Sequence, residues 1–281
     1  MRRFLTLSFL IGLPLAYSSS LLWAETSVSY SRTTGSQSFN GNNLDISLGG
    51  SGLNLGGGFT NYSSDVTTGT FTTYLLRLGG SNPEGTWQIF GSLSPEVDNY
   101  KAKSFGLKIN ADVPADEDEE PSNPAAKAET LFSYTRIMHT DNTSQPTDIN
   151  QNDVIGGLGY QIAKTSLMGT FTKSLYDQSI DGSSLRPARY MPIPGTSQQP
   201  QDYPDDVIFG RIDQGLLSWL KVWGSYTRVD YKEGTTGTAD SYTTGIGVFW
   251  QNIRLTVEYN QFIPSSGISN KYVTTGFSLG F

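Results

Sequence analysis

His139 is the only histidine in the chain, and Asp141 follows it two residues later. A histidine can act as a general base, and a nearby carboxylate can orient its ring. Catalysis would also require a nucleophile within hydrogen-bond reach of that base, and the residues around His139 form no serine or carboxylate motif that provides one. We therefore predict no catalytic residue and interpret His139 as a solvated residue at the end of a strand, beside a loop.

Features that could bind a metal or a cofactor are equally weak. The acidic run 116–120 has enough carboxylates for Ca²⁺, but it lacks the alternating ligand spacing and the turn glycine of a dedicated loop. The glycine cluster 49–58 is not followed by the Gly-Lys-Ser/Thr of a phosphate-binding loop. The chain has no cysteine, which excludes thiolate ligands. We predict no metal and no cofactor.

Charged and polar residues within extended segments are the third chemical feature. These residues are Asp45, Arg77, Lys108, Asn110, Arg211, Lys221, Arg254, Thr256, Glu258 and Asn260. Because Lys and Arg on the wall of a pore favour anions, this set would give a pore a mild anion preference. The segments around Arg77, Arg211 and Lys221 alternate poorly, so the facing of these three side chains is left open.

The elements that must position these residues are short alternating segments. In residues 253–260, every second residue is apolar and the residues between are polar or charged. Side chains of a strand point to opposite faces with period two, so such a segment predicts a strand with one apolar face. We expect fourteen strands, at residues 26–32, 42–48, 53–62, 70–78, 87–93, 105–110, 128–138, 153–162, 165–175, 207–212, 217–229, 242–250, 253–260 and 271–281. Residues 213–215 are expected to be the turn between the tenth strand and the eleventh.

The last eleven residues alternate strictly and end on an aromatic side chain. One face carries Val273, Thr275, Phe277, Leu279 and Phe281, and the other face is small or polar. This segment resembles the closing strand of bacterial outer-membrane β-barrels, which the assembly machinery of that membrane reads as a signal. The resemblance is to the architectural class and to no particular family within it. It implies a targeting role for Phe277, Leu279 and Phe281, a bacterial outer-membrane location, and contact with outer-membrane lipid and lipopolysaccharide.

The start of the chain fits that location. Residues 1–24 have a basic head and an apolar core and end in Ala24, which predicts a secretory signal peptide, with a single barrel domain at 25–281. Without this peptide, 17 basic residues (19 minus Arg2 and Arg3) face 26 acidic residues, a net charge of 17 − 26 = −9. Such a charge repels phosphates, so we predict no nucleic-acid partner.

We therefore predict an all-β fold, a closed antiparallel transmembrane β-barrel of about 14 strands. An even number of strands places both termini on one side, the periplasmic side, where most of the expected turns are short. The long acidic segment 114–127 also falls on that side, so about 12 strands is the alternative. The first strand should pair with the last, because unpaired backbone groups in hydrocarbon cost several kcal/mol each.

The expected interior is open and wet. Side chains fill the interior of a barrel of roughly eight strands, whereas a barrel of roughly sixteen strands encloses an aqueous channel. A barrel of about 14 strands lies between these two sizes. Inward positions of the last three strands are small or polar, so we expect no apolar plug from them.

These features favour a porin-like channel for passive diffusion of small hydrophilic solutes over an enzyme. In porins a long loop can fold into the barrel and set the constriction, and the candidate here is the loop 176–206 with Arg186, Arg189 and Tyr190. Two alternatives stay open. One is an outer-membrane hydrolase acting on lipid or peptide through His139 at the extracellular rim, and the other is a structural or adhesive barrel whose lumen the same loop closes.

Overall fold

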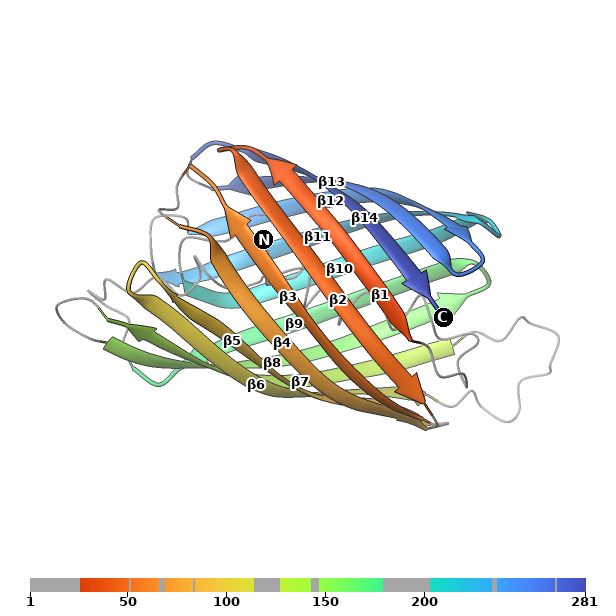
Figure 1. Cartoon of the computed structure of the whole chain (residues 1–281), viewed down its shortest axis with the longest axis horizontal. Helices are drawn as coiled ribbons and strands as arrows, with labels where there is room; N and C mark the ends of the chain where they lie inside the picture. The colour runs from red at the N-terminus through yellow and green to blue at the C-terminus, as the bar shows by residue number, and fades with distance from the viewer. Residues whose placement is uncertain are drawn as a thin grey trace.

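The chain folds into one antiparallel sheet that closes on itself (Figure 1). The computed structural model describes residues 26–50, 52–65, 69–82, 84–113, 127–142, 147–178, 203–233, 237–265 and 267–281. Its strands are β1 Ser27–Gly35, β2 Phe39–Gly50, β3 Leu53–Ser63, β4 Phe71–Asn82, β5 Gly85–Val97, β6 Tyr100–Val113, β7 Lys127–Asp141, β8 Thr147–Ile162, β9 Thr165–Tyr176, β10 Tyr203–Leu217, β11 Leu220–Glu233, β12 Thr238–Trp250, β13 Ile253–Pro264 and β14 Asn270–Gly280. No helix among the described residues is long and apolar enough to cross a membrane.

The barrel closes between its first and last strands. β1 pairs with β14 from Ser27 opposite Gly280 to Gly35 opposite Tyr272, and the two strands lie side by side in Figure 1. The backbone N–H of Phe281 donates to the carbonyl of Thr26 at 2.8 Å and extends the seam beyond the strands. Closure leaves no free sheet edge, which is the condition for a strand-built protein to lie in hydrocarbon. The predicted pairing of the first strand with the last is confirmed.

The two faces of the sheet differ in chemistry. Large apolar side chains at alternate positions point outward and are exposed, as for Leu76 (63%) and Leu158 (68%). The residues between them point inward and are mostly polar and buried or half-buried, such as Thr60 and Thr73. A barrel that faces lipid outside and water or side chains inside requires this alternation.

The strand count and most strand positions match the sequence prediction. All fourteen expected segments lie within or overlap the observed strands, and the closed barrel of fourteen strands excludes twelve. The prediction of a turn at residues 213–215 is wrong, because β10 continues through them and pairs Asp213 with Trp223. The chain reverses at residues 218–219 instead. β10 stays extended past these turn-forming residues because they pair with β11 on one side and, through Gln214, with β9 on the other, and Arg211 and Asp213 bind each other on the inward face.

The two ends of the barrel carry connections of different length. We call the end where β1 begins and β14 ends the terminal rim, and the other end the opposite rim. Connections at the terminal rim are residues 51–52, 83–84, 114–126, 163–164, 218–219 and 251–252. Connections at the opposite rim are residues 36–38, 64–70, 98–99, 142–146, 177–202, 234–237 and 265–269. The acidic segment thus joins β6 to β7 at the terminal rim, as the fourteen-strand count requires.

Several predicted features lie outside the described residues. They are the signal peptide at residues 1–24, the acidic run 116–120, and the loop residues Arg186, Arg189 and Tyr190. The predictions made for them stay predictions.

Candidate functional site

All the residues that the sequence suggested as a pore lining lie at inward-facing strand positions. Asp45, Arg77, Lys108, Asn110 and Asn260 are buried there. Arg211, Lys221, Arg254, Thr256 and Glu258 lie at inward positions and are half-buried. The facing of Arg77, Arg211 and Lys221, which the sequence left open, is therefore inward for all three. Whether these residues line a conducting pore stays a prediction.

Arg77 and Asp45 form an ion pair that crosses an entire strand. The two terminal guanidinium nitrogens of Arg77, Nη1 and Nη2, each donate to one carboxylate oxygen of Asp45 at 2.5 Å. Arg77 is on β4 and Asp45 on β2, with Gly56 and Gly58 of β3 between them, opposite Arg77 and Asp45 respectively. A Cβ on Gly56 would overlap the guanidinium, so the missing side chain makes room for this pair.

A second polar group lies on β10, β11 and β13. Arg211 donates to both oxygens of Asp213 at 2.7 and 2.8 Å, and its guanidinium lies 5.4 Å from the centroid of the Trp223 ring. The indole N–H of Trp223 donates to Glu258 at 3.1 Å. The ring lies flat against β12 where Gly245 has no side chain, because a Cβ at Gly245 would overlap it. This packing holds a large ring along the wall.

Two cations flank a phenylalanine near the terminal rim. The Lys221 ammonium lies 5.3 Å and the Arg254 guanidinium carbon 5.0 Å from the centroid of Phe249. All three side chains occupy inward positions on β11, β12 and β13. Cations near an aromatic face gain about 0.5–2 kcal/mol depending on solvation. The arrangement places two positive groups close together on one part of the wall.

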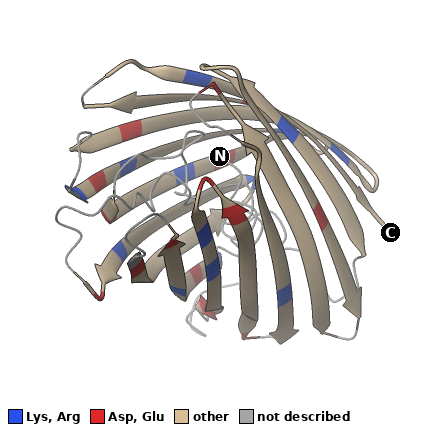
Figure 2. Ribbon diagram, turned by 60° about the vertical axis from the view of Figure 1, so that its left-hand side comes forward, with Lys and Arg blue, Asp and Glu red and all other residues tan. Residues whose placement is uncertain are grey.

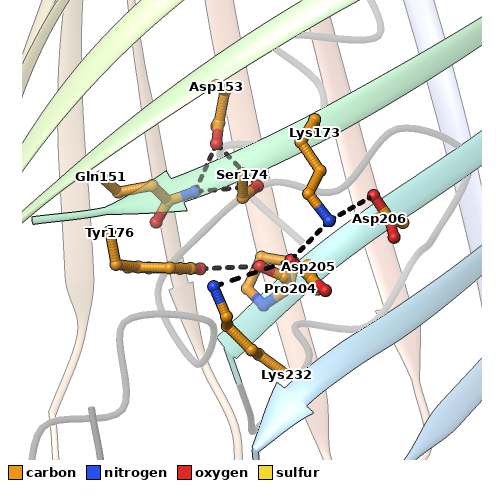
Figure 3. A network of polar contacts seen from close by, with 9 residues as sticks. All are labelled: Gln151, Asp153, Lys173, Ser174, Tyr176, Pro204, Asp205, Asp206 and Lys232. Carbon is orange, nitrogen blue, oxygen red and sulfur yellow. Dashed lines mark hydrogen bonds and ion pairs between the residues drawn. The ribbon is translucent and has the colours of Figure 1, made fainter. Parts of the chain in front are cut away.

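His139 belongs to a buried network toward the opposite rim. Its ring nitrogens lie 2.6 Å from the hydroxyl of Tyr100 and 3.2 Å from the amide oxygen of Gln151. Gln151 donates in turn to Asp153 at 2.7 Å, and Ser174 donates to the same carboxylate oxygen at 2.7 Å (Figure 3). The interpretation of His139 as a solvated residue is wrong, since it is 1% exposed. The cause is that β7 runs on to Asp141 and carries His139 inside the barrel.

A set of ion pairs lies at the same rim where β9, β10 and β11 meet (Figure 3). The ammonium of Lys173 lies 2.9 Å from Asp205 and 3.0 Å from Asp206, and Lys232 lies 4.0 Å from Asp205. The hydroxyl of Tyr176 donates to the carbonyl of Pro204 at 2.8 Å. These contacts occur at register shifts in the β10–β11 pairing, where the strand ladder is irregular. They hold the start of β10 against its neighbours.

Buried aromatic side chains form a belt inside the opposite rim, which we call the aromatic collar. Its members are Phe39, Tyr62, Phe71, Tyr100, Tyr203, Tyr231, Phe262 and Tyr272. Phe39 and Tyr62 stack at 5.7 Å, Tyr62 and Phe71 stack at 5.3 Å, and Tyr272 meets Phe39 edge-on at 5.5 Å. The collar is an apolar lining at one end of an otherwise polar wall.

The expectation that the inward positions of the last three strands are small or polar is only partly right, because inward aromatic side chains occur on all three, with Phe249 of β12 near the terminal rim. Phe262 of β13 and Tyr272 of β14 point inward as members of the aromatic collar. The sequence contained a signal for the collar, because each of these residues has the same parity as the polar residues of its strand. That signal was hidden near strand ends, where aromatic residues are more often placed at the lipid interface.

The inward charge is close to balanced. Further carboxylates that the sequence analysis did not count occupy inward positions among the described residues, including Asp112, Glu129, Asp141, Asp153 and Asp213. Figure 2 shows basic and acidic residues interspersed along the strands around the barrel. A solute inside would meet charges of both signs.

Comparison with known proteins gives the fold and no family. No protein-family model matches the chain, and no curated protein matches it in sequence. CdiB from Acinetobacter baumannii aligns over 93% of this chain and 60% of its own, with a TM-score of 0.51 and 8% identity. This chain therefore spans about three fifths of the CdiB chain. At this identity the shared feature is the barrel.

Two other structures align with lower scores. A KdgM porin in complex with disordered oligogalacturonate covers 91% of this chain and 99% of its own, with a TM-score of 0.45 and 9% identity. OccK11 (OpdR) from Pseudomonas aeruginosa covers 92% of this chain and 95% of its own, also with a TM-score of 0.45 and 9% identity. We base no functional argument on either similarity.

Proposed function

We propose that this protein is a membrane channel through which small hydrophilic solutes diffuse passively. The observation that carries the proposal is a closed sheet with an apolar outward face and a polar, charged inward face. The outward face suits hydrocarbon because the ring of strands leaves no backbone edge unpaired. Polar side chains on the inner wall need water or one another, and the half-buried Lys221, Arg254 and Thr256 are placed to meet water.

We further propose that the barrel lies in a bacterial outer membrane with the terminal rim on the periplasmic side. Barrels of that membrane have short periplasmic turns and longer extracellular loops. Five of the terminal-rim connections have two residues each, while the opposite rim carries the connection 177–202. The C-terminal residues Phe277, Leu279 and Phe281 would serve as the targeting signal for the assembly machinery.

A mild preference for anions is the finer part of the proposal. Arg77 and Arg211 are neutralised by Asp45 and Asp213, so they add little field to the lumen. Lys221 and Arg254, on either side of Phe249, would supply the preference near the terminal rim. The inward carboxylates limit its size.

Catalysis through His139 has little geometric support. Its ring is 1% exposed and its nitrogens are engaged by Tyr100 and Gln151, which leaves a lipid or peptide no direct approach. We therefore propose a non-enzymatic protein in which these contacts stabilise the wall. A second candidate function has a specific observation behind it. The buried aromatic collar fits a barrel that is narrowed or closed at the opposite rim and binds partners there.

Liposome swelling tests the channel against the closed barrel. Vesicles containing the refolded protein are diluted into isosmotic solutions of uncharged sugars, from a monosaccharide to a tetrasaccharide. The proposal expects swelling whose rate falls as the sugar grows, and none in protein-free vesicles. Folded protein that allows no swelling with the monosaccharide would favour the closed barrel.

A further inference from the structure

Three outward-facing cations gather on β6 and β7 toward the opposite rim. Lys101 and Lys103 are exposed on β6, and Arg136 is half-buried on β7. Arg136 is directly opposite Phe105, so Lys103 is its diagonal neighbour across the two strands. Diagonal neighbours in a sheet are about 7–8 Å apart, and residues two apart on one strand are about 7 Å apart. Three long, flexible cationic side chains can therefore reach one point.

These three cations differ from Lys173 and Arg228, two outward cations of the same rim on other strands. Among the described residues, no ion pair or hydrogen bond involves the side chain of Lys101, Lys103 or Arg136. On β9 and β11, by contrast, Lys173 binds Asp205 and Asp206, and Arg228 binds Asp230. Lys173 and Arg228 are thus paired with carboxylates of the barrel, whereas Lys101, Lys103 and Arg136 lie together and make no such contact among the described residues, and the neighbouring Glu96 of β5 accepts a hydrogen bond from Asn142.

The position of the three cations along the barrel axis indicates which part of a membrane would surround them. Toward the terminal rim, β6 presents Phe105, Leu107 and Ile109 outward, all exposed. On β7, the outward positions next to Arg136 in that direction are Tyr134 and Phe132, and the Tyr134 hydroxyl donates to Asn152 at 2.7 Å. Apolar side chains therefore begin where the cations end, and a tyrosine with a polar partner lies at the boundary. This is the order of residues expected at the level of lipid headgroups.

We propose that Lys101, Lys103 and Arg136 form a binding site for the phosphate groups of a lipid in the surrounding leaflet. One guanidinium group can bind two oxygens of a phosphate at once, and lysine ammonium groups add positive charge around the phosphate. A lipid held at this height places its phosphates at the cations and its acyl chains over Phe105, Leu107 and Ile109. The inference relies on the proposed membrane location and orientation, and it is independent of whether the lumen conducts.

The test uses the full mature barrel in a nonionic detergent and native mass spectrometry. The probes are lipid A carrying its two phosphates, the same lipid with both phosphates removed, and inorganic phosphate. The test variant is Lys101→Gln, Lys103→Gln and Arg136→Gln together. The matched control, Lys173→Gln, Arg228→Gln and Lys232→Gln together, changes the net charge equally on the other side of the barrel. Resistance of the folded band to sodium dodecyl sulfate before heating verifies that each variant folds.

We expect the wild-type protein and the control to retain phosphorylated lipid A, and the test variant to bind it roughly tenfold or more weakly. Dephosphorylated lipid should bind the wild-type protein as weakly as the phosphorylated lipid binds the test variant. Equal losses in both triple variants would overturn the proposal, because the effect would then follow net charge alone. Equal binding of the two lipids would also overturn it, since acyl chains alone would explain retention.

Two further outcomes would assign the cluster to another ligand. Cluster-dependent binding of inorganic phosphate that displaces the lipid completely at millimolar concentration would make it a site for free anions. Dimers in lipid-free detergent that disappear in the test variant would make it a contact between copies of the chain. If the triple variant does not fold, Lys103→Gln with Arg136→Gln replaces it, with Lys173→Gln and Arg228→Gln as its control, and the same outcomes decide.

Discussion

The Arg77 guanidinium binds Asp45 across an intervening strand, with both side chains buried. The pair links β2 to β4 on the inward side of β3. These two strands are not neighbours in the sheet, so no backbone hydrogen bonds join them directly. Gly56 permits it, because a Cβ there would overlap the Arg77 side chain. The bond fixes part of the inner wall near the middle of the barrel and neutralises both charges there.

Replacing Arg77 with Gln should destabilise the barrel substantially. The change leaves the Asp45 carboxylate buried without its partner, which costs about 3–5 kcal/mol in comparable buried pairs. The measurement is the free energy of unfolding from urea titration in phospholipid vesicles. Lys173→Gln is the matched control, because that more exposed ion pair should contribute no more than about 1 kcal/mol. Equal losses of unfolding free energy in the two variants would mean that the buried Arg77–Asp45 pair stabilises the barrel no more than an exposed ion pair does.

Removing a ring from the aromatic collar should widen the opposite end of the lumen. Tyr62 stacks between Phe39 and Phe71, so Tyr62→Ala deletes the centre of this run. We expect a higher unitary conductance, together with a loss of about 3–5 kcal/mol of unfolding free energy typical of large aromatic deletions. Tyr74→Ala, at an outward position 52% exposed, is the control and should leave the conductance unchanged. An unchanged conductance in Tyr62→Ala would place the narrowest point elsewhere.

Neutralising the two cations around Phe249 should shift ion selectivity. In Lys221→Gln with Arg254→Gln, the inward carboxylates outnumber the remaining inward cations, so the reversal potential in a salt gradient should move toward cation preference. Lys173→Gln with Arg228→Gln removes the same charge from the outward face and should move it far less. A shift of equal size in both variants would show that the lumenal pair does not set selectivity.

The seam can be tested with cysteines, since the chain has none of its own. Thr33 and Thr274 are directly opposite on β1 and β14, and their hydroxyl oxygens are 2.7 Å apart. Thr33→Cys with Thr274→Cys should form a disulfide under mild oxidation, seen as a shift in electrophoretic mobility that a reductant reverses. Thr33→Cys with Ser278→Cys is displaced by four residues and should not cross-link. Efficient linkage of the displaced pair, without the direct one, would contradict the register.

The sequence was sufficient for the architecture because period-two alternation has one physical solution in a membrane. Residues 253–260 and 271–281 separate apolar from polar side chains so cleanly that strand type and facing follow directly. Closure follows from the cost of unpaired backbone groups, and the pairing of β1 with β14 agrees with it. The turn at 213–215 was misplaced because Asp213 and Gly215 are turn formers by type, whereas pairing with β9 and β11, which are distant in sequence, keeps them in the strand.

The contacts inside the barrel could not be predicted in the same way. Which inward residues meet depends on register between strands that are far apart in sequence, as for Arg77 with Asp45 or Trp223 with Glu258. His139 was misread because its burial depends on partners from β6 and β8. The position of a residue in the period-two alternation assigns it to a face of the sheet. It does not show whether a charged residue there has an oppositely charged partner.

Single-channel recording in a planar lipid bilayer shows whether this barrel conducts. The refolded mature chain, added at low concentration to one side, should insert and produce discrete, uniform steps of conductance that persist at low voltage. Tyr62→Ala in the same experiment should give larger steps. Insertion of demonstrably folded protein that leaves the membrane current at the level of a bare bilayer would mean that the barrel is not a channel.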